Sequence, residues 1–550
     1  MASGPTTAAP TGGVGRASAL LAAGTLVSRI LGFVSLLALA RAIGVSTAGS
    51  NTFSLANQLP NNIYAIVAGG LLSAVIVPQI VRAGSHDDGG ERFVNRIVTL
   101  GGVVFILIAA IATACAPLLV NLYAQQSASG IRGYSQADLD LATAFAFWCL
   151  PQVLFYALYS LLGEVLNARG RFGAFTWAPV VNNVVAIAGI LAFSIAFGSR
   201  GLGPVASWTP AMVATLAGTA TLGVAAQAAT LALFWRHTGL RYRPEFTWRG
   251  VGLGSVGKAA GWTFAMVLVT QLAGIVQTNV ATLAGSTGAS TSVLRYSWLI
   301  FMLPHSIVAV SIATAYFTRM SGHAHRGDLA AVRDDLSASL RTIGLIMVFA
   351  SVGLIVLAYP FAAVFAHTEA DVRAMGAVLI AFLLGLVPFS ALFLLQRVFY
   401  ALEDTRTPFV VQVFQAVLFV AGALLVSTLP SDRIAFGIAL VTSVAGVLQM
   451  ILAAVLVRRR LGMIGAGRIA RQHLQYLLGM VPTAVVGAGT CLAMGAYTGG
   501  YGTASVGGAI VTLVVSGASM AFIYVVALGI LRVDELRDLV RPVFLRLRRR

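Results

Sequence analysis

The chain has 550 residues, of which 58% are hydrophobic and only 10% are charged, and its mean hydropathy is +0.88. No soluble fold can keep so much apolar surface from water, so the composition excludes a series of soluble domains and predicts an all-α polytopic membrane protein. The formal net charge is +18. Three cysteines in apolar runs (Cys115, Cys149 and Cys491) favour neither a disulfide framework nor a thiolate metal site.

The first 17 residues are rich in Gly, Pro, Thr and Ala, and we interpret them as a disordered cytoplasmic tail. Beyond them, apolar runs of about 20 residues recur as far as residue 531, each long enough to cross the hydrocarbon core as a helix. We predict about fourteen spans: 18–42, 53–82, 95–123, 139–166, 174–198, 207–235, 256–284, 290–318, 342–366, 372–400, 408–428, 434–457, 472–496 and 502–531.

The basic residues are distributed unevenly between the predicted loops. With the N-terminus in the cytoplasm, 29 of the 36 lysines and arginines fall in inner segments and six in outer ones, while Arg29 lies well inside a span. By the positive-inside rule, this split supports fourteen helices and predicts a multi-pass membrane protein with both termini in the cytoplasm. The basic tail at 532–550 is then a topogenic segment facing anionic membrane lipids, and we expect no nucleic-acid partner.

Two short similarities relate the halves of the sequence. Residues 59–65 (LPNNIYA) match residues 303–309 (LPHSIVA) at an offset of 244, and a second similarity has an offset of 237. Each offset spans six helices, which predicts two parallel six-helix lobes around a central cavity, with two C-terminal helices added. The predicted domains are a tail (1–17), an N-lobe (18–245), a C-lobe (246–457), helices 13 and 14 (458–531) and a basic cytoplasmic tail (532–550).

Polar groups inside the membrane are costly and are therefore candidates for function. Arg29 lies near the middle of the first span, where its guanidinium suits a phosphate, although it could also fix packing between lobes. Lys258 and Arg295 begin spans 7 and 8, where each is either a ligand group or a topological anchor. Mid-membrane carboxylates are nearly absent, which argues against an antiporter with an Asp or Glu proton carrier.

Amides and helix-bending residues complete the candidate site. Asn57, Asn61, Asn182 and Asn183 lie in spans 2 and 5, and Gln271, Gln277 and Asn279 lie in span 7. These amides could bind sugar or pyrophosphate, or hydrogen-bond one helix to another. We expect Pro60 and Pro304 to kink their helices, and Gly69 and Gly70 to allow a lobe to bend. No nucleophile lies beside a base and no nucleotide-binding motif occurs, so we predict neither an enzyme nor a cofactor.

Several segments together resemble the MurJ/MviN family, the lipid II flippases of the multidrug/oligosaccharidyl-lipid/polysaccharide exporter superfamily, and among these the actinobacterial type. The segments are SRILGF (28–33), LPN (59–61), AGGLLSAVIVP (68–78), LNARGRF (166–172) with Asn182 and Asn183, and FYALEDTRTP (399–408). The resemblance covers residues 18–530 and implies fourteen helices in two lobes. It also implies export of the lipid-linked peptidoglycan precursor, lipid II, across the bacterial inner membrane in cell-wall biogenesis. The two-lobed architecture predicted from the repeat suits alternating access.

The sequence also departs from that family. Its first-helix arginine matches Arg29, but the other positions of its arginine cluster hold Ser35, Tyr64 and Trp298. An acidic position of the family holds Asn51. Either Arg29, Arg295 and Lys258 replace the cluster, or the chain moves another polyprenyl-linked glycan. The sequence is also compatible with a small-molecule exporter or with a non-transporting scaffold of the cell-wall synthesis machinery.

Overall fold

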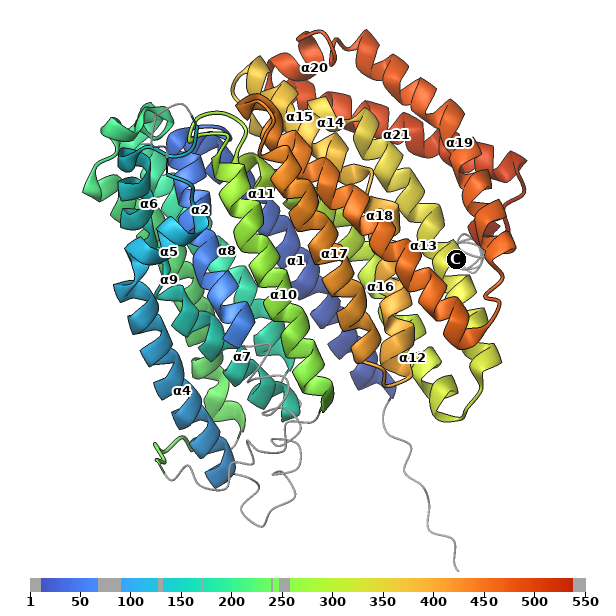
Figure 1. The fold of residues 1–550 in the computed structure, drawn as a ribbon, viewed down its shortest axis with the longest axis horizontal. Coiled ribbons are helices and arrows are strands. Elements are labelled where there is room, and N and C mark those ends of the chain that lie inside the picture. Colours follow the sequence, from blue (N-terminus) through green and yellow to red (C-terminus); the bar gives the residue numbers. More distant parts are fainter. Residues whose placement is uncertain are drawn as a thin grey trace, which may run out of the picture. The chain divides into compact units, whose positions relative to one another are not determined.

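The computed structural model describes residues 11–67, 91–126, 132–169, 172–238, 241–246 and 258–537. Across these ranges the regular elements are helices and no strand occurs, which confirms the predicted all-α class (Figure 1). Hydrocarbon offers no hydrogen-bond partners, and an α-helix satisfies its backbone polar groups internally. This sequence therefore folds into consecutive helices.

Thirteen helical segments of the described chain are long and apolar enough to cross a membrane. Each corresponds to one of the predicted spans. The remaining predicted span, 53–82, begins in α2 (Ala48–Val67) and continues into residues outside the described part. The outer surfaces of the spans carry apolar side chains that water would disfavour, such as Ile195, Leu233 and Ile530, which are 86%, 74% and 76% exposed. Lipid is the solvent that suits this surface, and the chain is a multi-pass membrane protein.

The helices belong to two compact units. Unit 1 comprises Met1–Ala42, Ala56–Val120 and Leu141–Gly257. Its helices pack closely where small residues face a neighbour, as in transmembrane bundles generally. For example, a Cβ atom added at Gly189 would lie 2.2 Å from the Thr219 hydroxyl oxygen, between α8 and α9. The helices with all or part of their length in this unit are α1 (Thr11–Ile43), α2, α4 (Glu91–Ala114), α5 (Ala116–Tyr123), α6 (Gln136–Cys149), α7 (Gln152–Ala168), α8 (Phe172–Phe197) and α9 (Pro210–Phe234).

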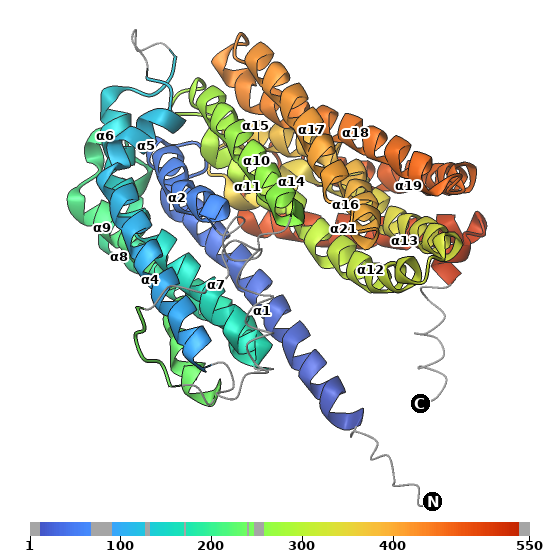
Figure 2. The ribbon, with the colours of Figure 1, turned by 60° about the horizontal axis from the view of Figure 1, so that its bottom comes forward.

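Unit 2 comprises Ile43–Leu55, Asn121–Asp140 and Lys258–Arg550. Helices α16, α17 and α18 run side by side (Figures 1 and 2), α10 packs on α17, and α19 packs on α13 and α21. The unit therefore includes the segment predicted as separate helices 13 and 14. Its principal helices are α10 (Lys258–Thr282), α11 (Thr291–Pro304), α12 (Val310–His325), α13 (Leu329–Val356), α14 (Ala358–Phe365), α15 (Glu369–Leu383), α16 (Leu386–Ala401), α17 (Arg406–Val426), α18 (Ile434–Leu461), α19 (Ala466–Ala493), α20 (Tyr501–Ala504) and α21 (Val506–Ile530).

A π-helical turn interrupts the span that contains Pro304. Helix α11 ends at this proline, residues His305–Ala309 form the π turn, and α12 continues from Val310. Proline has no N–H to donate and its ring crowds the preceding turn, which explains the local change of hydrogen-bond pattern. Pro60, the corresponding residue of the sequence repeat, lies inside α2.

Candidate substrate-binding site

Arg29 lies in α1 and is half-buried. The neighbouring backbone is held by Asn183 of α8, whose side-chain amide donates to the Ser28 carbonyl oxygen at 2.8 Å. Gly32, one turn further along α1, lies beside the same amide, where an added Cβ atom would make ordinary van der Waals contact at 3.7 Å from the Asn183 nitrogen. Asn183 thus joins α1 to α8 and positions the segment that carries Arg29.

Asn57 is part of a hydrogen-bonded group at the junction of three helices. Gln152 of α7 donates to the Asn57 side-chain oxygen at 3.2 Å and to the Thr221 hydroxyl oxygen of α9 at 2.9 Å. Thr221 in turn donates to the Trp148 carbonyl oxygen at 2.7 Å. Asn57 therefore connects α2 to α7 and α9. Asn61, one turn beyond it on α2, is exposed.

The other predicted residues of the site are placed differently. Asn182 lies against α9, where a Cβ atom at Gly223 would be 2.5 Å from its side-chain oxygen. Arg295, in α11 of unit 2, is half-buried, and its Nη1 atom is enclosed without a hydrogen-bond partner among the residues that the structure describes. Lys258 begins α10, and its side chain lies outside the described part, as do Gly69 and Gly70. Arg29, Asn57, Asn61, Asn182 and Asn183 thus belong to unit 1, and Arg295 and Pro304 to unit 2.

Asn51, which occupies an acidic position of the resembled family, is fully buried and uses both sides of its amide. Its nitrogen donates to the carbonyl oxygens of Ser286 and Gly288 at 2.8 and 3.2 Å. Its side-chain oxygen accepts from the Ser292 backbone N–H and hydroxyl at 3.0 and 2.6 Å. A carboxylate could not donate to the two carbonyls, so the amide matches its surroundings where an acid would not.

Trp298, which stands where a cluster arginine is expected, forms one wall of an aromatic cavity within unit 2. Its ring stacks on Phe301 with centroids 4.9 Å apart, and it meets Phe382 and Phe389 edge-to-face at 5.5 and 5.8 Å. The cavity holds about 350 Å³ and lies among α10, α11, α15, α16, α17 and α18. Its described lining includes no charged side chain.

Glutamine amides form the polar side of this cavity. Gln449 of α18 donates to the Gln412 side-chain oxygen of α17 at 3.1 Å, and Gln412 donates to Gln415 at 3.0 Å. Gln277 of α10 and Gln396 of α16 also line the cavity, and neither makes a hydrogen bond to another described residue. Gln277 was one of three span-7 amides named from the sequence, with Gln271 and Asn279, whereas the cavity glutamines of spans 10, 11 and 12 were missed. Spacing was a usable signal, since Gln412 and Gln415 are three residues apart and so share a helix face.

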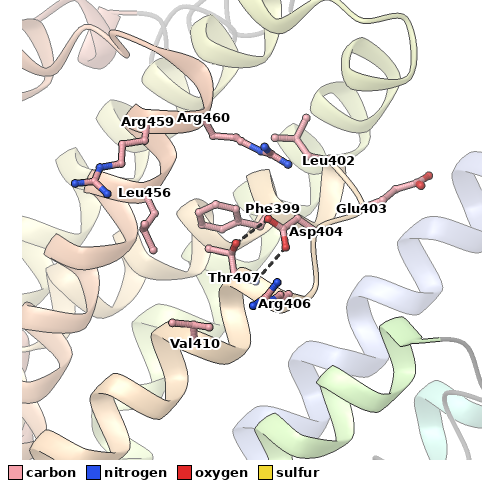
Figure 3. A pocket seen from close by; sticks show the side chains of 10 residues that line it. All are labelled: Phe399, Leu402, Glu403, Asp404, Arg406, Thr407, Val410, Leu456, Arg459 and Arg460. Atoms are coloured by element: carbon pink, nitrogen blue, oxygen red, sulfur yellow. Dashed lines mark hydrogen bonds between the residues drawn. The ribbon is translucent and has the colours of Figure 1, made fainter.

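A second, basic pocket of about 720 Å³ lies where α17 begins and α18 ends (Figure 3). Arg406, Arg459 and Arg460 line it together with the acids Glu403 and Asp404. Burial alone would raise the pKa of the Asp404 carboxyl, but hydrogen bonds from the Thr407 N–H (3.0 Å) and hydroxyl (2.7 Å) and the charge of Arg460 outweigh it, so this pKa is lowered. Asp404 therefore stays ionised and fixes the turn that begins α17.

Solved structures share this arrangement of helices. A lipid II flippase MurJ in an inward closed conformation matches with a TM-score of 0.73 at 19% identity, covering 95% of this chain and 99% of that one. An inward-facing multidrug resistance MATE family transporter of the MOP superfamily matches with a TM-score of 0.58 at 16% identity, covering 78% and 95%. The fold is that of the MOP-superfamily transporters, a class of multi-pass helical membrane proteins.

Sequence comparison narrows the class to a family. The family model described as lipid II flippase MurJ matches residues 39–512. A probable lipid II flippase MurJ of Haemophilus influenzae is 28% identical over 404 residues, which cover 70% of this chain and 75% of that protein. Another, of Thermotoga maritima, is 24% identical over 526 residues, covering 94% and 97%. The chain belongs to the lipid II flippase MurJ family, a family of transporters and not of enzymes, which confirms the resemblance found in the sequence.

Proposed function

We propose that the protein is a lipid II flippase that moves undecaprenyl-diphosphate-linked disaccharide pentapeptide from the inner to the outer leaflet by alternating access. The family match over residues 39–512 carries this proposal. Arg29 binds the diphosphate, with Asn183 holding the Ser28–Arg29 backbone in place through its 2.8 Å hydrogen bond. A bidentate guanidinium lowers the cost of carrying phosphate charge through a medium of low dielectric. We also assign Lys258 and Arg295, in unit 2, and the exposed Asn61, in unit 1, to cargo binding.

The driving force comes from the membrane potential, an ion gradient or consumption of the product outside, since the chain carries no nucleotide-binding motif. We place both termini in the cytoplasm on the distribution of basic residues. A C-terminal reporter that is active only in the cytoplasm tests this orientation. Activity of the matched periplasmic reporter instead would overturn it.

The activity is tested in cells depleted of their own lipid II flippase and expressing this protein. An enzyme added from outside that cleaves only exposed lipid II should release product, and Arg29→Ala should abolish the release at normal membrane abundance. Arg373→Ala, which removes an exposed arginine outside the proposed site, is the matched control and should leave the release unchanged. Full release by Arg29→Ala would refute its role. No release by the wild-type protein at good expression would refute lipid II as cargo.

A second cargo is favoured by one observation. Two positions where family arginines are expected hold aromatic residues, Trp298 and Tyr64. Trp298 meets the Phe382 ring edge-to-face, and the Tyr64 ring packs on Tyr156 with centroids 5.8 Å apart. Another polyprenyl-linked glycan is therefore the second candidate cargo after lipid II. In the depletion assay it predicts no cleaved lipid II but export of a different glycan in cells that overproduce the corresponding lipid-linked precursor.

A further inference from the structure

The aromatic cavity of unit 2 has the chemistry of a binding site for an uncharged, hydroxyl-rich ring. We propose that it is a subsite that binds one sugar unit of the cargo headgroup, an inference that rests on the proposed function. Gln277, Gln412, Gln415 and Gln449 supply the polar side and Trp298 the aromatic side. The subsite is distinct from the cationic residues to which we assign the diphosphate.

The absence of charge excludes ionic ligands. Neither a carboxylate nor a cation belongs to the described lining of the cavity. A diphosphate or a charged peptide group would lose its hydration there without a counter-charge, which costs several kcal/mol. The ligand that the cavity accepts is therefore neutral.

The hydrogen-bonding capacity suits hydroxyl groups. Three amide N–H groups are already used, because Gln412 donates to Gln415 and Gln449 donates to Gln412 and to the Val411 carbonyl oxygen. The amide N–H groups of Gln415, Gln277 and Gln396 donate to no other described residue and remain available to a ligand. The Thr270 and Thr442 hydroxyls donate to carbonyls of their own helices at 2.9 and 2.8 Å, so toward the cavity they can only accept. A sugar hydroxyl both donates and accepts, so it can use both kinds of group.

The size and shape agree with a single ring. The cavity volume of about 350 Å³ lies at the lower end of the range for small-molecule pockets, roughly 300 to 1,000 Å³. The cavity is therefore too small for a disaccharide with its peptide. The Trp298 ring is held by Phe301, Phe382 and Phe389 and so offers a fixed apolar surface on which the C–H face of a pyranose can pack.

Gly446 of α18 lines the cavity and offers a direct test. A Cβ atom added there would meet nothing within 4 Å, so Gly446→Leu should extend into the cavity without a clash at its Cβ atom and should strengthen the helix. Gly489→Leu in α19 is the matched control, since its Cβ atom also meets nothing within 4 Å and it lies outside the cavity. Gln277→Leu removes one cavity amide without breaking a hydrogen bond between described residues. Gln475→Leu in α19 is its control, since Gln475 is also half-buried, makes no hydrogen bond to another described residue and lies outside the cavity.

Binding is measured with the full-length protein in lipid nanodiscs, using lipid II and undecaprenyl diphosphate, which has the same lipid and diphosphate but no sugar. We expect Gly446→Leu and Gln277→Leu to weaken lipid II binding about tenfold, leaving undecaprenyl diphosphate binding and both controls unchanged. If these two variants weaken the binding of both lipids equally, or of neither, the sugar subsite is overturned, while the proposal of lipid II transport is unaffected. Failure of the wild-type protein to prefer lipid II over undecaprenyl diphosphate, together with no flipping in cells, overturns both proposals.

Discussion

Replacing Asn51 by aspartate should destabilise unit 2 even though the two side chains have the same shape. The amide nitrogen donates to two carbonyl oxygens, of Ser286 and Gly288, at a position where the side chain is fully buried. Aspartate leaves both carbonyls without a donor and places a carboxylate oxygen against them. Ser286 is half-buried and Gly288 is exposed, so water can replace the lost donor at Gly288 but only partly at Ser286. At about 1–3 kcal/mol for one polar group left without a partner, the loss amounts to roughly 1–3 kcal/mol, before the cost of burying a charge.

The measurement is thermal unfolding of the full-length protein in detergent, followed by intrinsic fluorescence at pH 7.5. We expect the apparent Tm of Asn51→Asp to fall by several degrees. Acid pH should restore part of the loss, because a protonated carboxyl group regains one donor. Asn61→Asp makes the same chemical change at an exposed position of the same helix and should leave the apparent Tm unchanged. A Tm for Asn51→Asp equal to that of the wild-type protein would refute the reasoning.

Gly189→Ala should cost about 1–3 kcal/mol in thermal unfolding, because its Cβ atom would lie 2.2 Å from the Thr219 hydroxyl oxygen, whereas Gly102→Ala, with nothing within 4 Å, should be neutral or stabilising. Equal Tm values for the two variants would contradict the close packing of α8 on α9. Asp404→Ala should lower stability at pH 7 by about 0.5–2 kcal/mol through loss of its bonds to Thr407. The pKa of Asp404 is lowered in the folded protein, so the ionised carboxylate stabilises the fold at pH values above its ordinary pKa of about 3.9. This stabilisation is lost as the pH falls through the lowered pKa. The difference in stability between wild type and Asp404→Ala should therefore close in acid. A gap that stays constant down to pH 3 would argue against this role.

The sequence was sufficient to predict the spans because hydropathy and helix length are local properties. Thirteen predicted spans correspond to described helices, and the interruption at Pro304 was expected from the ring chemistry of proline. The roles of the amides were not predictable in the same way. Asn57 and Asn183 are hydrogen-bonded to Gln152 and Ser28, which lie 95 and 155 residues away along the chain.

The glutamine cavity shows the same limit more clearly. Helical spacing places Gln412 and Gln415 on one face of their span, but it does not reveal that this face meets Gln449 of the next span. The hypotheses from the sequence therefore named cations, whose intramembrane cost is visible in sequence, and amides of spans 2, 5 and 7, but not the glutamines of spans 10, 11 and 12. A neutral binding surface is formed by several helices, each contributing a residue that is unremarkable alone, and only their packing reveals it.

The π turn at His305–Ala309 has a consequence for how this span tolerates length changes. A π turn holds one residue more than an α-helical turn, so deleting one residue between His305 and Ala309 would restore an ordinary α-helix and leave α12 close to its present rotation relative to α11. The same deletion inside α12 would rotate everything beyond it by about 100°. The buried His305 ring begins the π turn, and its Nδ1 lies 3.0 Å from the Ser390 hydroxyl oxygen of α16. The turn is thus the place where this span can lose a residue without a phase shift of the helix that follows.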